Sequence, residues 1–202
     1  MNALAGARIG PNALIQVAHA LAAAPGEASA RHLFRLAGLA GYLDAPPASM
    51  VDELEVARLH RSVRANLGPA QARRVFRDAG QRTATYLMAN RIPRPLQALL
   101  RRMPSGLAAR VLLRAIGQHA WTFAGSGRFE ARYGQPVVLT ITGNPLCRGV
   151  ASLVPVCDYY AATFEHLFRS LVHPETRVIE TACEATGAPA CVLELSWRAR
   201  PT

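Results

Sequence analysis

The segments PVCDYYAATFEHLF (155–168), TRVIET (176–181) and CVLELSW (191–197) decide the fold of this chain. In the first segment apolar residues return every three or four positions, which predicts a helix from about Val156 to Val172. The other two segments alternate apolar and polar residues and are separated by Gly187-Ala188-Pro189, which predicts two strands joined by a turn. The end of the chain therefore predicts a long helix followed by a β-hairpin.

Upstream, a strongly β-forming run occupies 136–142, and most of the chain before it has helical periodicity. Helices are predicted at about 12–24, 27–39, 49–67, 69–92, 96–103 and 105–119, with Asn12, Ser49 and Ser105 as capping residues and Pro69 at a first helical position. These elements predict an α+β fold: a helical N-terminal part packed on a C-terminal antiparallel sheet with helices on one side. No flexible linker interrupts residues 1–202, which predicts a single domain.

The composition indicates a folded protein with a strong positive charge. Half of the 202 residues are hydrophobic and 18% are charged, which argues against disorder. All 23 basic residues are arginine, and the net charge is +10. The arginines are spread along predicted helices without a nucleic-acid-binding motif, so nucleic acid is not the expected partner. A diffuse positive field suits an anionic membrane surface, an acidic partner or a ligand with carboxylates.

The sequence also predicts a cytoplasmic protein. Residues 1–8 lack the charged start and apolar core of a signal peptide. No apolar run approaches the roughly 20 residues that a membrane helix needs. Four cysteines in such a chain are expected to be reduced thiols, hence metal ligands or core residues. Any contact with a membrane would be peripheral.

Three cysteines and one glutamate near the C-terminus are candidate metal ligands: Cys157, Glu180, Cys183 and Cys191. Cys157 is expected at a helix N-terminus, where the helix dipole favours a thiolate. Cys183 and Cys191 are expected to face each other across the hairpin, with Glu180 near them. Thiolates and a carboxylate suit a tetrahedral zinc site, but buried cysteines also serve as small apolar residues, and the spacing alone leaves both interpretations open.

A longer set of residues resembles a known family. It comprises Cys157-Asp158-Tyr159-Tyr160, Phe164-Glu165, Glu180 to Cys183, Gly187 and Cys191, and continues upstream in 121–127 and 144–149. These residues resemble the four-vinyl-reductase domain, a small-molecule-binding module of bacteriochlorophyll biosynthesis and of the sensor domains of aromatic-responsive transcription activators. His60-Arg61 and the segment 86–93 resemble the biosynthetic members, so the resemblance covers most of the chain.

The resemblance implies a structural zinc site, because the matching positions of the sensor members are zinc ligands. It implies Cys157, Glu180, Cys183 and Cys191 as ligands here and leaves Cys147, in the loop after Pro145, outside the set. It also implies that residues 119–202 form the small-molecule-binding core with the hairpin metal site, beside a mainly helical part at 1–118. The biosynthetic members imply a bound magnesium tetrapyrrole as the ligand and other enzymes of bacteriochlorophyll synthesis as partners.

Aromatic and basic residues are candidates for holding such a ligand. A flat macrocycle stacks on aromatic rings, an imidazole can ligate a chelated metal, and guanidinium groups bind carboxylates. The ordinary alternatives, a core aromatic, a helix-end histidine and a solvated arginine, stay open for each of them. The candidates are His119, Trp121, Phe123, Phe129, Tyr133, Arg91 and Arg94.

The sequence favours a binding protein over an enzyme. A vinyl reductase needs a hydride donor or an iron–sulfur cluster, but Gly125-Ser126-Gly127 lacks the context of a dinucleotide fingerprint and the cysteines lack ferredoxin spacing. The leading hypothesis is a carrier of a magnesium porphyrin or a (divinyl) protochlorophyllide in bacteriochlorophyll biosynthesis. The alternative is an 8-vinyl (formerly 4-vinyl) reductase that receives electrons from a partner. A ligand-responsive adaptor is disfavoured because the sequence shows no output domain.

Overall fold

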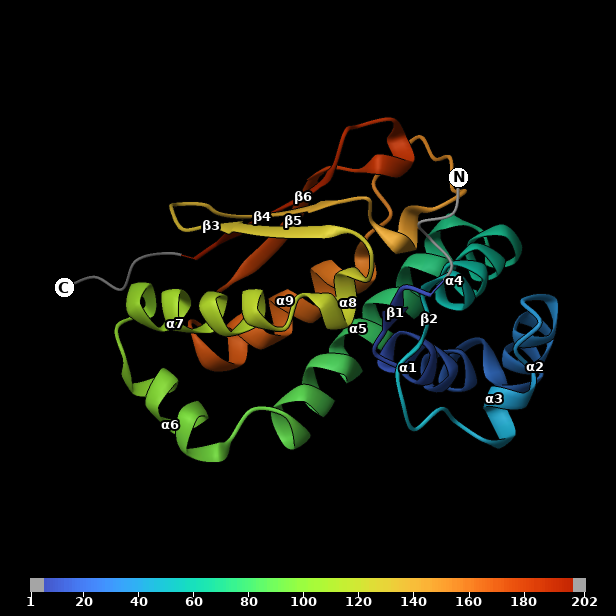
Figure 1. The fold of residues 1–202 in the computed structure, drawn as a ribbon, viewed down its shortest axis with the longest axis horizontal. Helices are drawn as coiled ribbons and strands as arrows, with labels where there is room; N and C mark the ends of the chain where they lie inside the picture. The colour runs from blue at the N-terminus through green and yellow to red at the C-terminus, as the bar shows by residue number, and fades with distance from the viewer. Residues whose placement is uncertain (1–5, 198–202) are drawn as a thin grey trace.

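The computed structural model describes residues 6–197 and contains a four-stranded antiparallel sheet with helices along one face (Figure 1). The strand order is β3-β4-β6-β5. Helices α7 (Ser105–Gln118) and α9 (Asp158–Leu171) run beneath this sheet in the view of Figure 1. The predicted α+β class is confirmed. The strands are β3 (Arg128–Arg132), β4 (Val137–Thr142), β5 (Arg177–Ala182) and β6 (Cys191–Ser196).

The two central strands bury one face because their apolar residues alternate. Val137, Leu139 and Ile141 of β4 are fully buried, and so are the alternate residues of β6, Leu193 and Leu195. The register pairs Leu139 with Leu193, so both rows lie on the same side of the sheet. The sheet therefore has one apolar face, and it is the face toward the helices.

The N-terminal two thirds of the chain form a helical part that packs directly on α9 through the longest helix, α5 (Pro69–Asn90). Gly80 makes this close crossing possible, because a Cβ atom there would lie 2.9 Å from Ala162 Cβ and nearer still to the Tyr159 carbonyl. Thr163 Oγ1 donates to the Gly80 carbonyl at 3.2 Å. The other elements are β1 (Arg8–Ile9), α1 (Asn12–Leu21), a π-helical turn (Ala22–Gly26), α2 (Glu27–Leu36), α3 (Gly41–Asp44), β2 (Val51–Asp52), α4 (Glu53–Leu67), α6 (Arg94–Arg102), α8 (Trp121–Ala124), and 3-10 turns at Pro145–Cys147 and Glu184–Thr186.

The predicted helix starts were right for Pro69 and wrong in detail for the three capping residues. Pro11 precedes α1, and Asn12 lies inside its first turn. Asp52, rather than Ser49, caps α4 and accepts a hydrogen bond from the Leu54 amide at 2.8 Å. Pro104 precedes α7, and the hydroxyl of Ser105 donates to the Val172 carbonyl at 3.2 Å. For Ser105, a tertiary contact therefore uses the hydroxyl that the local pattern assigned to capping.

The sequence pattern did not indicate two features of the structure. Trp121 and Phe123 belong to a short helix, α8. His60 of α4 is fully buried although charged and polar residues surround it in the sequence. Its ring stacks on Phe76 at 4.6 Å and meets Tyr159 edge-on at 5.6 Å. Its Nε2 lies 3.2 Å from the Ala13 carbonyl, and burial lowers its pKa to about 3. His60 is therefore a neutral core residue.

Candidate metal centre and ligand groove

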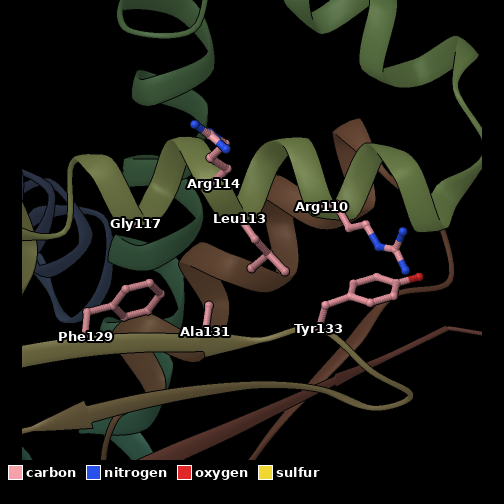
Figure 2. Close-up of a pocket in the computed structure, with 7 residues that line it drawn as sticks. All are labelled: Arg110, Leu113, Arg114, Gly117, Phe129, Ala131 and Tyr133. Atoms are coloured by element: carbon pink, nitrogen blue, oxygen red, sulfur yellow. The ribbon is translucent and has the colours of Figure 1, made fainter.

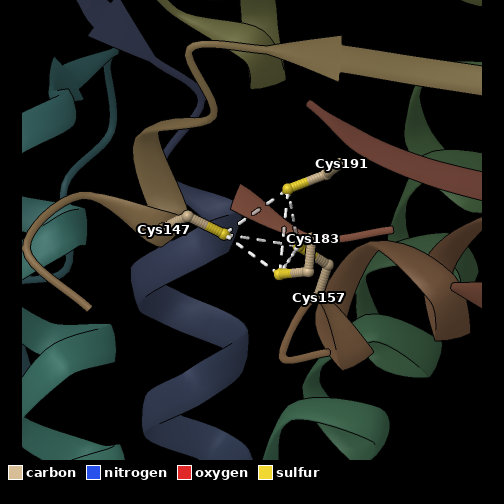
Figure 3. Close-up of side chains that lie close together, drawn as sticks. All are labelled: Cys147, Cys157, Cys183 and Cys191. Atoms are coloured by element: carbon tan, nitrogen blue, oxygen red, sulfur yellow. Dashed lines mark hydrogen bonds between the residues drawn. The ribbon is translucent and has the colours of Figure 1, made fainter. Parts of the chain in front are cut away.

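Four buried cysteines from four different segments meet beside the sheet (Figure 3). Cys147 ends the 3-10 turn after β4, and Cys157 is the residue that precedes α9. Cys183 follows β5, and Cys191 opens β6. Three of the four side chains are fully buried, and Cys147 is 5% exposed. The predicted place of Cys157 at a helix N-terminus is confirmed.

The four sulfur atoms lie at the corners of a nearly regular tetrahedron. The Cys147 sulfur lies 3.5, 3.8 and 3.6 Å from those of Cys157, Cys183 and Cys191. The remaining three separations are 4.0, 3.4 and 4.0 Å. A tetrahedral centre with metal–sulfur bonds of about 2.3 Å has sulfur–sulfur edges of about 3.8 Å. The donor set and its spacing therefore fit a four-coordinate, thiolate-bound metal ion.

Asn144 supplies hydrogen bonds to this sulfur group. Its side-chain nitrogen, Nδ2, lies 3.2 Å from both Cys157 Sγ and Cys191 Sγ, and the side chain is fully buried. The backbone amide of Asn144 in turn donates to the Glu184 carboxylate at 2.8 Å. Hydrogen bonds to ligand atoms from neighbouring side chains fix the ligands and stabilise their charged form. Asn144 is therefore positioned to hold two thiolates in place.

Arg64 of α4 joins the two cysteine-bearing loops. Its guanidinium donates to the carbonyl of Leu146 at 3.1 Å and to that of Val156 at 2.8 Å, the residues that immediately precede Cys147 and Cys157. The guanidinium also stacks on Phe76, at 4.6 Å from the ring centre. Burial lowers the pKa of Arg64, whereas the neighbouring thiol groups oppose that shift. A positive charge here offsets the negative charge of a thiolate cluster.

The thiols have unequal proton affinities. Hydrogen bonds from Cys147 and Cys157 lower the pKa of Cys183 to about 6, and the same two neighbours lower that of Cys191 further. Hydrogen bonds with the other three thiols, followed by burial, raise the pKa of Cys157. Part of the group is therefore predisposed to the thiolate form that metal binding requires.

Cys147, which was predicted to lie outside the ligand set, lies within this group of sulfur atoms. The strand β4 and the turn that Asn144 and Pro145 begin carry Cys147 back toward the hairpin, a tertiary effect that sequence spacing does not show. The feature of the sequence that could have indicated the position of Cys147 is the Asn144-Pro145 turn, directly after a buried strand. Three of the four predicted ligands, Cys157, Cys183 and Cys191, are brought together as expected.

Glu180, the fourth predicted ligand, lies next to the group and contacts the backbone of Cys157. Its Oε2 accepts a hydrogen bond from the Cys157 amide at 2.7 Å. Its Oε1 is buried and has no hydrogen-bond partner within the described residues. Burial raises the pKa of Glu180 to about 8. The compact donor set that the structure brings together consists of the four cysteines.

A groove of about 320 Å³ lies between α7 and β3, apart from the cysteines (Figure 2). The helix contributes Arg110, Leu113, Arg114 and Gly117, and the strand side contributes Phe129, Ala131 and Tyr133. The Arg110 guanidinium lies 4.3 Å from the centre of the Tyr133 ring. The groove therefore combines an apolar floor with a positively charged edge.

Of the predicted ligand-binding residues, Phe129 and Tyr133 line this groove. Phe123 packs edge-on against Phe129 at 5.1 Å, in an aromatic cluster with Phe164 and Tyr160. The other four candidates lie outside the groove and expose their side chains: His119, Trp121, Arg91 and Arg94. Sequence reasoning missed the helix residues of the groove, although Arg110, Arg114 and Gly117 follow the spacing of one helical face.

The segment Gly125-Ser126-Gly127 makes a buried contact with Glu53, and a Cβ atom at Gly125 would collide with the same carboxylate. The amide and hydroxyl of Ser126 donate to the two carboxylate oxygens of Glu53, at 2.8 and 2.9 Å. Arg148 pairs with the same fully buried carboxylate. Burial raises the pKa of Glu53, but the hydrogen bonds from Arg148 and Ser126 outweigh it and lower the pKa. This segment joins α8 to β3.

None of the helices in residues 6–197 is both long and apolar enough to cross a membrane.

Comparisons of the sequence with a domain profile and with known proteins agree on one family. A sequence profile of the four-vinyl-reductase domain matches residues 137–196. The "Bacteriochlorophyll synthase 23 kDa chain" of Cereibacter sphaeroides is 45% identical over 193 residues, which cover 96% of this chain and 92% of the relative. The protein of the same name from Rhodobacter capsulatus is 38% identical over 195 residues, covering 96% of this chain and 90% of the relative.

Solved structures show where the fold recurs. The phenol-responsive sensory domain of the transcription activator PoxR superposes with a TM-score of 0.52 at 16% identity, covering 72% of this chain and 74% of that domain. An H-NOX structure from a study of heme distortion gives a TM-score of 0.60 at 14% identity, covering 96% and 97% of the two chains. At these identities the likeness concerns the fold alone. By its full-length relatives, the chain belongs to the family of the bacteriochlorophyll synthase 23 kDa chains and carries a four-vinyl-reductase domain at residues 137–196.

Proposed function

We propose that this protein binds a magnesium porphyrin or a (divinyl) protochlorophyllide and carries it between enzymes of bacteriochlorophyll biosynthesis. The observation that carries the proposal is the full-length similarity to two proteins named for bacteriochlorophyll synthesis, over 96% of this chain in each case. The matched residues span the helical part, the cysteine group and the groove. The proposal therefore extends the relatives' part in bacteriochlorophyll synthesis to the whole of this chain.

The fold supports a ligand of this size and shape. The H-NOX study concerns the distortion of heme, so another protein of this fold holds a tetrapyrrole. In this chain the groove between α7 and β3 offers aromatic and apolar surface with arginines at its edge. A flat macrocycle with ionised carboxylates matches that combination.

The alternative function is an 8-vinyl reductase, and it requires a source of electrons. Among the residues described, Gly125-Ser126-Gly127 is the one GxG segment, and its Ser126 amide is already bonded to Glu53 at 2.8 Å. A phosphate would have to displace that buried carboxylate. This contact favours the carrier over a reductase with its own nucleotide site.

One experiment separates the carrier from the reductase. Purified protein is mixed with divinyl protochlorophyllide, with and without NADPH, and the absorbance spectrum is followed. A shift on mixing without conversion supports the carrier, and conversion to the monovinyl product supports the reductase. A spectrum identical to the sum of the separate components would overturn the proposal.

The metal in the cysteine group is proposed to be a structural zinc ion. Four thiolates leave no open coordination position, which distinguishes a structural from a catalytic zinc site. Soft sulfur donors at these distances suit zinc better than magnesium or calcium. The residues that would hold the metal are Cys147, Cys157, Cys183 and Cys191, and the metal would tie the N-terminus of α9 to β4 and to the hairpin.

Delivery of a ligand implies contact with other proteins of the pathway and with the membrane that contains them. The net charge of +10 attracts anionic surfaces, and such attraction weakens with salt. Sedimentation with vesicles that contain anionic lipid tests this contact. Binding that persists at about 1 M salt, where charges are screened within a few ångströms, would contradict an electrostatic, peripheral association.

A further inference from the structure

The edge strand β3 presents apolar residues that the fold leaves uncovered. The register pairs Phe129 with Ile141 and Ala131 with Leu139, so these residues point to the same face of the sheet. Ile141 and Leu139 are fully buried. Ala131 is exposed, and Phe129 is only partly buried. The buried apolar face of the sheet therefore continues onto β3 and is open there.

Helix α7 passes over this open face without filling it. Leu113 points from the helix toward Ala131, and the space between helix and strand is about 320 Å³ (Figure 2). Gly117 contributes to the gap because it has no side chain, and a Cβ atom placed there would meet no atom within 4 Å. The groove is thus an open space between two rigid elements, which is where preformed ligand sites occur.

Arg110 and Tyr133 form the polar end of the groove. The guanidinium lies over the Tyr133 ring at 4.3 Å, and Tyr133 is 41% exposed. Within residues 6–197, neither Arg110 nor Arg114 makes an ion pair. Two like charges one helical turn apart repel each other, so an anion between or beside them is favoured. A guanidinium fixed by stacking also loses little freedom when it binds a carboxylate.

We infer that the groove between α7 and β3 binds one carboxylate-bearing edge of a flat, apolar ligand, with Arg110 as the carboxylate anchor. The inference rests on the proposed function and names the site at which the tetrapyrrole is held. The face of the macrocycle contacts Phe129, Ala131 and Leu113. The Tyr133 hydroxyl lies at the same end of the groove as Arg110. Arg114 adds positive charge at the rim.

The size of the groove defines the mode of binding. Ligand pockets span roughly 300–1,000 Å³, so a groove of about 320 Å³ lies at the lower limit. It accommodates one edge of a tetrapyrrole and leaves the remainder of the ring accessible. A half-exposed ligand is suited to transfer, because a receiving enzyme can contact it before it is released.

The test is an absorbance titration with two probes, magnesium protoporphyrin IX and its dimethyl ester. Arg110→Gln should weaken binding of the free acid roughly 10- to 100-fold, because a charge-assisted hydrogen bond is lost, and should leave binding of the ester unchanged. Arg94→Gln is the matched control. It removes the same charge from an exposed position outside the groove and should leave both affinities within about twofold.

A second variant tests the groove itself. Gly117→Leu places a side chain in the open space and should abolish binding of both probes while the melting temperature is retained. If wild-type protein binds the free acid and Arg110→Gln binds it equally well, or if Arg94→Gln loses as much affinity, the inference is overturned and the carrier function stands. If wild-type protein binds neither probe and also leaves the spectrum of divinyl protochlorophyllide unchanged, the proposed function falls, and the inference with it.

Discussion

The sulfur of Cys147 lies 3.5 Å from that of Cys157, although ten residues and a change of direction separate them in the chain. This pair completes a sulfur tetrahedron with Cys183 and Cys191. Glu180 is not part of this compact group, and its carboxylate accepts a hydrogen bond from the Cys157 amide. The two possible ligand sets, four cysteines or three cysteines with Glu180, make opposite predictions.

Cys147→Ser should lose the metal, and Glu180→Gln should keep it. Wild-type protein is expected to contain about one zinc ion per chain by elemental analysis. Loss of the ion should lower the melting temperature by roughly 10 °C, because metal binding contributes directly to folding free energy. A Cys147→Ser protein with full zinc content, together with a zinc-free Glu180→Gln protein, would restore the three-cysteine set.

Arg64→Gln should weaken metal binding roughly 10- to 100-fold, which is the usual effect of losing a residue that orients metal ligands. The physical reason is that Arg64 bonds the carbonyls of Leu146 and Val156, next to two ligands. Competition with a chromogenic chelator measures the affinity. Arg61→Gln removes an equal charge from an exposed position of the same helix and should leave the affinity unchanged. Equal losses in both variants would assign the effect to net charge.

His60 should make the protein less stable as the pH falls below 6.5. Its pKa is about 3 in the folded protein, against 6.5 in the unfolded chain, so the unfolded state binds the extra proton between these values. The stability contributed by the neutral ring is complete above pH 6.5 and is lost as the pH falls toward 3. Between about pH 7.5 and 5.5 the loss should be roughly 1.4 kcal/mol.

Urea unfolding at several pH values measures this dependence. His60→Gln should flatten the slope of the unfolding free energy against pH, even though the variant is less stable overall. His32→Gln, at an exposed position of α2, should keep the wild-type slope. An unchanged slope in His60→Gln would show that other groups cause the acid sensitivity.

Two glycines should respond in opposite directions to alanine substitution. Gly80→Ala forces a methyl group against the Tyr159 carbonyl and Ala162, so α5 and α9 must separate, at a cost of about 1–3 kcal/mol. Gly117→Ala meets open space in α7 and removes a flexible residue from a helix, so it should leave stability unchanged or raise it by up to about 1 kcal/mol. Thermal unfolding of the two variants compares them. A stable Gly80→Ala protein would contradict the close crossing of the helices.

The sequence by itself determined the elements and the fold class. The periods of about 3.6 and 2 residues identified α5, α9 and the strands β4, β5 and β6, because each element must bury one apolar face. Pro69 and Cys157 were placed correctly at helix starts. The preference of proline for the first helical position and that of a thiolate for a helix N-terminus both act within one turn. Three of the four cysteines of the metal group were identified by their resemblance to a known family.

Only the tertiary structure decided which residues meet. Cys147 joins the sulfur group because the chain turns back after β4, and no local pattern encodes that direction. His60 is buried because Phe76 and Tyr159 approach it from α5 and α9, so a residue on a polar-looking helix becomes core. The groove exists because α7 passes over β3 at a distance, which depends on the packing of both elements rather than on either sequence. Contacts between distant segments depend on how well two surfaces pack against each other. The local sequence of a segment determines only its own surface.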